Sequence, residues 1–113
     1  MSKRETKLLL SDIIESIDKI KRYTLGYTFE EFLNDSKTSD AVVRNFEIIG
    51  EAANRIPEEI RDQNNQINWH RIKGFRNRIV HDYMGVDYNI VWSIIHNDID
   101  RLRSDISKVL DSE

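Results

Sequence analysis

Three side chains whose types suit chemistry on a phosphate group lie close together in the chain: Arg76, His81 and Tyr83. The imidazole of His81 can take or give a proton near neutral pH, as a general acid or base does. The guanidinium of Arg76 can bind a phosphate through two hydrogen bonds and offset charge that develops in the transition state. The phenol of Tyr83 can bond the phosphate or orient the imidazole.

Each of these residues also has a purely structural interpretation. His81 can be a surface histidine bonded to a backbone carbonyl, and Tyr83 can fill the edge of a core with its hydroxyl in water. Arg76 can form an ion pair with Glu47 or Glu51 of a neighbouring helix, and such a pair can also aim the guanidinium. Spacing alone favours the structural interpretation of His81 and Tyr83.

Further polar residues surround the three. Asn77 lies four positions before His81, so its amide can hold the imidazole if both residues lie on one helix. Lys73 and Arg71 extend the basic character, although a solvated helix face explains them equally well. Residues 69–83 are locally basic within an acidic chain of net charge −3; their fixed charges are Arg71, Lys73, Arg76 and Arg78 against Asp82.

A helix through this segment places Arg76 and Tyr83 on the same face as a set of apolar residues, at about 100° per residue. A guanidinium is rarely buried without a partner, so we expect a carboxylate, a cleft or a second subunit beside Arg76. The apolar residues of this face are Trp69, Ile72, Phe75, Ile79 and Val80.

A single straight helix does not aim Arg76 and His81 at one atom, because they lie about 140° apart around it. The helix therefore ends or bends between Val80 and Tyr83, or two copies of the segment meet across a two-fold axis. Gly85 supplies a stop signal shortly afterwards.

The remaining pattern predicts an all-α, antiparallel bundle of four to five helices, because apolar residues recur at helical spacing and no strand-like alternation appears. Gly50 lies beside a packing seam and permits the close approach of another helix. Asn68 caps the helix that carries Arg76, and Thr28 begins a short capped turn. The predicted helices span residues 3–25, 39–56 and 88–110, with a short piece at 57–63.

The composition limits the other possibilities. A chain of 113 residues predicts one domain, and no apolar run approaches the ~20 residues of a membrane span. The absence of cysteine and the scattered positions of the three histidines predict neither a disulfide nor a metal site. We expect a cytoplasmic protein whose acidic balance excludes broad nucleic-acid coating but permits a focused phosphate site.

The spacing of Arg76, His81 and Tyr83 resembles the R-x4-H-x-Y motif of HEPN domains, most closely the HepT-like toxins of prokaryotic toxin–antitoxin pairs. The segment 44–52 is similar to the second helix of that family, and the resemblance covers most of the chain. It implies one HEPN-like domain over residues 1–113, which acts as a homodimer. It also implies a cofactor-free, metal-independent endoribonuclease site, formed by Arg76 and His81 at the dimer cleft.

The resemblance further implies a type VII-like toxin–antitoxin pair whose toxin cuts RNA, such as tRNA or mRNA. A minimal, MntA-like nucleotidyltransferase antitoxin would neutralise it by adding AMP to Tyr83. Lys73 and Asn77 would position the substrate, and Glu47 and Glu51 would support Arg76. Two alternatives are a non-catalytic helical module that binds the nucleotidyltransferase, and a bundle that binds a nucleotide or another small molecule.

Overall fold

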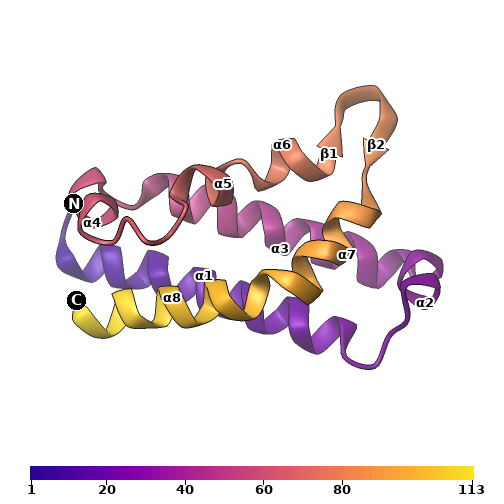
Figure 1. Cartoon of the computed structure of the whole chain (residues 1–113), viewed down its shortest axis with the longest axis horizontal. Helices are drawn as coiled ribbons and strands as arrows, with labels where there is room; N and C mark the ends of the chain where they lie inside the picture. Colours follow the sequence, from indigo (N-terminus) through magenta and orange to yellow (C-terminus); the bar gives the residue numbers. More distant parts are fainter.

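Three long helices form the body of the molecule (Figure 1). The computed structural model describes residues 1–113 except the side chain of Asp82. Helix α1 (Lys3–Thr24) runs antiparallel to α3 (Ser36–Arg55), and α8 (Ile99–Ser112) returns along α1. The all-α prediction is confirmed. The shorter helices are α2 (Phe29–Asn34), α4 (Glu58–Gln63), α5 (Trp69–Lys73), α6 (Phe75–Ile79) and α7 (Tyr88–Asn97).

The core lies between α1, α3 and the C-terminal helices. Helix α1 buries the apolar stripe that its sequence spacing predicts, and α3 buries the facing seam. Helix α1 ends before Gly26, whose φ of 78° suits glycine. The fully buried residues of the two helices include Leu10, Ile13, Ile17, Ile20, Val42, Phe46, Ile49 and Ala53.

Side-chain caps fix the starts of several helices, as the sequence predicts. Thr28 and Glu31 form a capping box, with hydrogen bonds of 3.1 and 2.9 Å to each other's backbone N–H groups. Asn68 accepts a hydrogen bond from the N–H of Arg71 at 3.0 Å and so caps α5. Helix α3 begins three residues before its predicted start, because Asp35 caps it by accepting a bond from the N–H of Thr38.

Two helices that the sequence predicts as continuous are broken in the structure. The helix expected over 88–110 divides at Asp98 into α7 and α8; the carboxylate of Asp98 bonds Arg71 of α5 at 2.8 Å. The helix expected to run from its cap at Asn68 through Arg76 breaks at Gly74, which separates α5 from α6. Both breaks let the later helix change direction and pack on the body.

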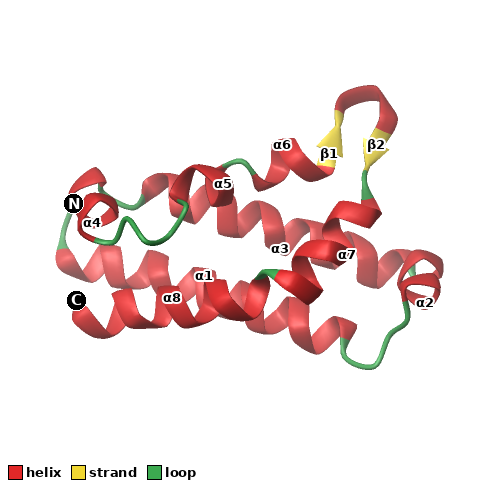
Figure 2. Ribbon diagram, viewed as in Figure 1, coloured by secondary structure: helices red, strands yellow, loops and turns green.

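A small antiparallel hairpin follows α6 and projects from the body (Figure 2). Strand β1 (Val80–His81) pairs with β2 (Gly85–Val86) around the 3₁₀ turn η1 (Asp82–Met84), in the register Val80 to Val86 and His81 to Gly85. No strand-like alternation in the sequence indicates this hairpin. In the described part of the chain, no helix has the length and apolar character that crossing a bilayer needs.

Candidate active site

Helix α6 carries Arg76 and is fixed to the body by its apolar face. Phe75 and Ile79 are buried, and the ring of Phe75 meets that of Phe46 on α3 edge-on, with centroids 5.4 Å apart. Gly50 of α3 allows this closeness, because a Cβ there would lie 3.3 Å from the carbonyl oxygen of Ile72. The predicted close approach at Gly50 is therefore present, and it places α5 and α6 against α3.

The guanidinium of Arg76 points outward beside a carboxylate of α3. Its Nε lies 3.9 Å from Oε2 of Glu47, and 64% of the Arg76 side chain is exposed. Glu51, the other expected partner, lies 3.8 Å from Arg44 instead. Arg76 is thus aimed by one loose ion pair and keeps most of its hydrogen-bonding edge open to solvent.

A polar hollow of about 480 Å³ opens beside Arg76, between α3 and the α5–α6 pair. Cationic and amide groups suited to a phosphate share it with two carboxylates. The lining side chains include Glu47, Glu51, Asn54, His70, Lys73, Arg76 and Asn77. Lys73 and Asn77, which the sequence predicts as positioning residues, therefore lie with Arg76.

His81 lies beyond the end of α6, on the hairpin. Helix α6 ends at Ile79, one residue before the stretch in which the first of the two sequence-based alternatives placed its end. The N–H of Asp87 donates to the carbonyl of Ile79 at 2.7 Å. Nε2 of His81 lies 3.9 Å from Oδ2 of Asp87, and about half of the imidazole side chain is exposed. His81 lines a second hollow of about 400 Å³, against α2 and the start of α7.

Within one chain, therefore, Arg76 and His81 line different hollows. Asn77 shares the hollow of Arg76 and does not line that of His81, because the two residues are not on one helix. Tyr83 is 99% exposed at the hairpin tip. The expectation that Tyr83 belongs to the buried face was wrong, because the chain leaves the helix before reaching it.

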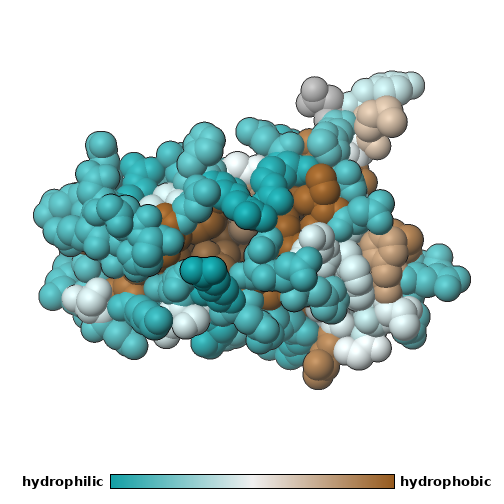
Figure 3. All heavy atoms as spheres, viewed as in Figure 1, coloured by the Kyte–Doolittle hydropathy of each residue, from teal (hydrophilic) through white to brown (hydrophobic). Residues whose placement is uncertain are grey.

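The basic segment around the motif is divided between two faces. Lys73 and Arg76 face the polar hollow, whereas Arg71 bonds Asp98 and lines a third hollow of about 310 Å³. Arg78 is half-buried, and its burial and the nearby charge of Arg71 lower its pKa. This third hollow lies between α5 and α8, where apolar atoms show through the hydrophilic surface (Figure 3).

A model of the family described as "Ribonuclease HepT-like" matches residues 13–109. The chain belongs to this HepT-like family. The match covers both hollows, with Arg76, His81 and Tyr83. The HEPN resemblance of the sequence is thereby confirmed.

Relatives with ribonuclease names cover nearly the whole chain. A Thermococcus cleftensis protein named "Probable ribonuclease HepT" is 38% identical over 107 residues, which are 95% of this chain and 97% of the relative. A Methanocaldococcus jannaschii protein named "Putative RNase" is 37% identical over 110 residues, 97% of this chain and 91% of the relative. A similarly named Caldanaerobacter subterraneus protein is 34% identical over 104 residues, 92% and 93% of the two chains. No solved structure matches the chain.

Two residues that line these hollows, Asp87 and His70, were not among the site residues predicted from the sequence. Asp87 was recognisable as a helix cap, but its second oxygen faces His81 only because the hairpin folds back. His70 lies beside Lys73 through the turn of α5, and no sequence signal marked it. Among the described residues, no group of three or more His, Cys, Asp or Glu side chains is arranged to hold a metal ion.

Proposed function

We propose that this HepT-like chain is an endoribonuclease that needs no metal ion and cuts RNA between two copies of itself. The observation that carries the proposal is the placement of Arg76 and His81, five residues apart in the chain, in separate hollows that are both open to solvent. A two-fold axis offers a way to bring the guanidinium of one copy to the imidazole of the other. The family match supports the reaction class.

RNA supplies its own nucleophile, so the protein has only to move protons and stabilise charge. His81 removes the proton of the 2′-hydroxyl, and the 2′-oxygen attacks the neighbouring phosphorus. The bond to the 5′-oxygen breaks, and the same imidazole, now protonated, returns the proton to that oxygen. Arg76 offsets the charge on the phosphorane-like transition state. The products carry a 2′,3′-cyclic phosphate and a 5′-hydroxyl.

The polar hollow supports the phosphate-binding part of this proposal. Lys73 adds a second cation beside Arg76, and the Asn77 amide can donate to a phosphate oxygen. Glu47 limits the directions in which Arg76 can point. Glu51 does not contact Arg76 directly, because its carboxylate pairs with Arg44.

Tyr83 is proposed as the point of control. Its phenol stands fully exposed at the hairpin tip, two residues after His81, where another enzyme can reach it. In the proposed modification the phenol oxygen attacks the α-phosphate of ATP and pyrophosphate leaves. The transferring enzyme would be a minimal nucleotidyltransferase antitoxin. The added AMP then places a charged, bulky group beside the imidazole and excludes RNA.

Cleavage of RNA in EDTA by purified protein tests the function. The His81→Ala variant is expected to keep its melting temperature, since His81 is about half exposed, and to lose at least about 100-fold in rate. His96→Ala is the matched control, because His96 is another exposed histidine and lines neither hollow. Unchanged cleavage by His81→Ala would overturn the mechanism.

Mass spectrometry after incubation with ATP and the nucleotidyltransferase tests the control step. A gain of one AMP on Tyr83, with loss of cleavage, is expected. Modification of a protein that cuts no RNA before or after would favour the alternative, a non-catalytic partner of the nucleotidyltransferase.

A further inference from the structure

The hollow beside His81 is built differently from the hollow beside Arg76. Its walls come from three elements: α2, the hairpin and the start of α7. Apolar and aromatic side chains form most of it, with an amide and a carboxylate at the edge. The lining side chains on which the proposal below depends are Phe29, Leu33, Met84, Asp87, Tyr88 and Asn89.

Two aromatic rings that line this hollow, those of Phe29 and Tyr88, each pack against another aromatic ring. The ring of Phe29 packs on Trp92 with centroids 5.7 Å apart, and the ring of Tyr88 meets Phe32 edge-on at 5.9 Å. Phe29 and Tyr88 are each only partly buried, so they still offer surface to solvent. Aromatic side chains of this kind are the surfaces on which unpaired bases of single-stranded RNA stack.

The charges of the two hollows select different parts of a nucleotide. Among the described residues that line the His81 hollow, none is lysine or arginine, and Asp87 contributes a carboxylate. A phosphate is therefore disfavoured there. The Arg76 hollow offers it Lys73 and Arg76, and the two carboxylates of that hollow, Glu47 and Glu51, lie beside Arg76 and Arg44. The amide of Asn89 both donates and accepts hydrogen bonds, as the polar edge of a base requires.

We propose that the His81 hollow binds the base of a nucleotide next to the cleaved bond, with the base against Phe29 and its polar edge toward Asn89. This subsite rests on the proposed ribonuclease function and gives it a means of choosing where to cut. A volume of about 400 Å³ is enough for one base. A base can lie against Phe29 only when it is unpaired and turned out of its stack, so the subsite takes a base from a single-stranded or looped segment.

Binding of an uncleavable oligonucleotide tests the subsite apart from the reaction. The probes are fluorescent 2′-O-methyl RNA octamers, which lack the 2′-hydroxyl nucleophile, and an abasic octamer with the same phosphates. Wild-type protein is expected to bind at least one of the base-bearing octamers about tenfold more tightly than the abasic one.

The variants separate base from phosphate contacts. Phe29→Ala is expected to weaken only the base-bearing octamer, whereas Phe29→Tyr keeps the ring and the affinity. Asn89→Ala changes an exposed side chain, so it reports on the subsite even if Phe29→Ala fails to fold. Arg76→Ala is expected to weaken both octamers. Leu25→Ala, an exposed apolar residue outside the hollow, is the control and should change neither.

The outcomes distinguish this proposal from the ribonuclease itself. Equal binding of both octamers, or no binding of either, overturns the base subsite whether or not RNA is cut. Selective binding without cleavage of ordinary RNA supports the subsite and overturns the nuclease. Equal binding together with altered sedimentation of Leu33→Ala would assign the hollow to a contact between copies instead.

Discussion

Asp87 faces His81 with one carboxylate oxygen while it caps helix α7 with the other. Oδ2 lies 3.9 Å from Nε2 of His81, and Oδ1 accepts a hydrogen bond from the N–H of Ile90 at 3.2 Å. At 3.9 Å the contact to the imidazole is electrostatic and too long for a hydrogen bond. One residue thus connects the position of the imidazole to the start of α7.

Substitutions of Asp87 separate these two roles. Asparagine caps a helix as well as aspartate does, so Asp87→Asn is expected to keep the free energy of unfolding. It removes the charge that faces His81, and cleavage is expected to fall, though by less than in His81→Ala. Asp87→Ala loses both roles and about 1 kcal/mol of stability. Thermal unfolding and kcat/KM on one RNA provide the comparison; wild-type cleavage by Asp87→Asn would reduce Asp87 to a helix cap.

The hairpin turn depends on Gly85, which pairs with His81 and has φ 81° and ψ −152°. Gly85→Ala is expected to cost about 1–3 kcal/mol, because a side chain is strained in this region. Gly26, at φ 78° after α1, is the matched control. Both alanine variants should melt at lower temperature, and only Gly85→Ala should also slow cleavage at a temperature where both remain folded. Equal cleavage by the two would show that the turn does not position His81.

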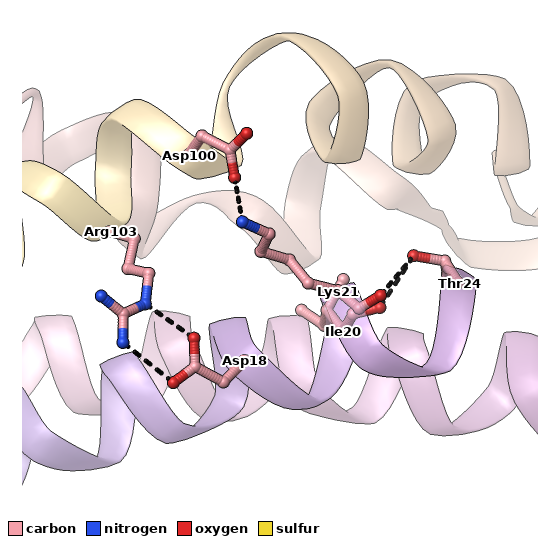
Figure 4. A network of polar contacts seen from close by, with 6 residues as sticks. All are labelled: Asp18, Ile20, Lys21, Thr24, Asp100 and Arg103. Carbon is pink, nitrogen blue, oxygen red and sulfur yellow. Dashed lines mark hydrogen bonds and ion pairs between the residues drawn. The ribbon is translucent and has the colours of Figure 1, made fainter. Parts of the chain in front are cut away.

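An ion pair between α1 and α8 makes stability depend on pH (Figure 4). Arg103 donates to Asp18 through Nε at 2.7 Å and through a terminal nitrogen at 3.1 Å. Chiefly through the hydrogen bond to Arg103, the pKa of Asp18 lies below its ordinary value of 3.8. The carboxylate therefore stabilises the fold above pH 3.8, and this contribution is lost as pH falls through the lowered pKa.

Asp18→Asn tests this dependence. The variant is expected to unfold at lower denaturant concentration than wild type at pH 7, by a small margin because the pair is partly exposed. The difference should shrink as the pH is lowered below 3.8, where the wild-type carboxylate gains its proton. A difference that stays constant down to pH 2 would assign the loss to packing instead.

Local chemistry made much of the fold predictable. The stripe of α1 and the caps at Thr28 and Asn68 depend on nearby residues, so spacing and residue type predict them. The residue at the break, Asp98, bonds a partner far along the chain, Arg71. Apolar spacing continues through that break, so periodicity alone predicts one helix.

The sequence predicted which residues belong to the candidate site better than it predicted where they lie relative to one another. Lys73, Arg76 and Asn77 lie within five residues of one another and share a hollow, although the break at Gly74 places Lys73 on α5 and the other two on α6. The place of His81 depends on a two-residue strand pair, which is too short to leave a periodic signal. Tyr83 was expected on a buried helix face, and the same hairpin moves it into solvent.

The most direct test of the central claim measures RNA cleavage in EDTA by Arg76→Ala and His81→Ala, separately and after mixing under conditions that exchange subunits. We expect each variant alone to be inactive. In a mixed dimer, the intact Arg76 of one copy meets the intact His81 of the other, so one site is complete. Cleavage should return to about one quarter of the wild-type rate, since about half of the dimers are mixed and each has one of two sites. A mixture that remains as inactive as its components would contradict a site shared between two copies.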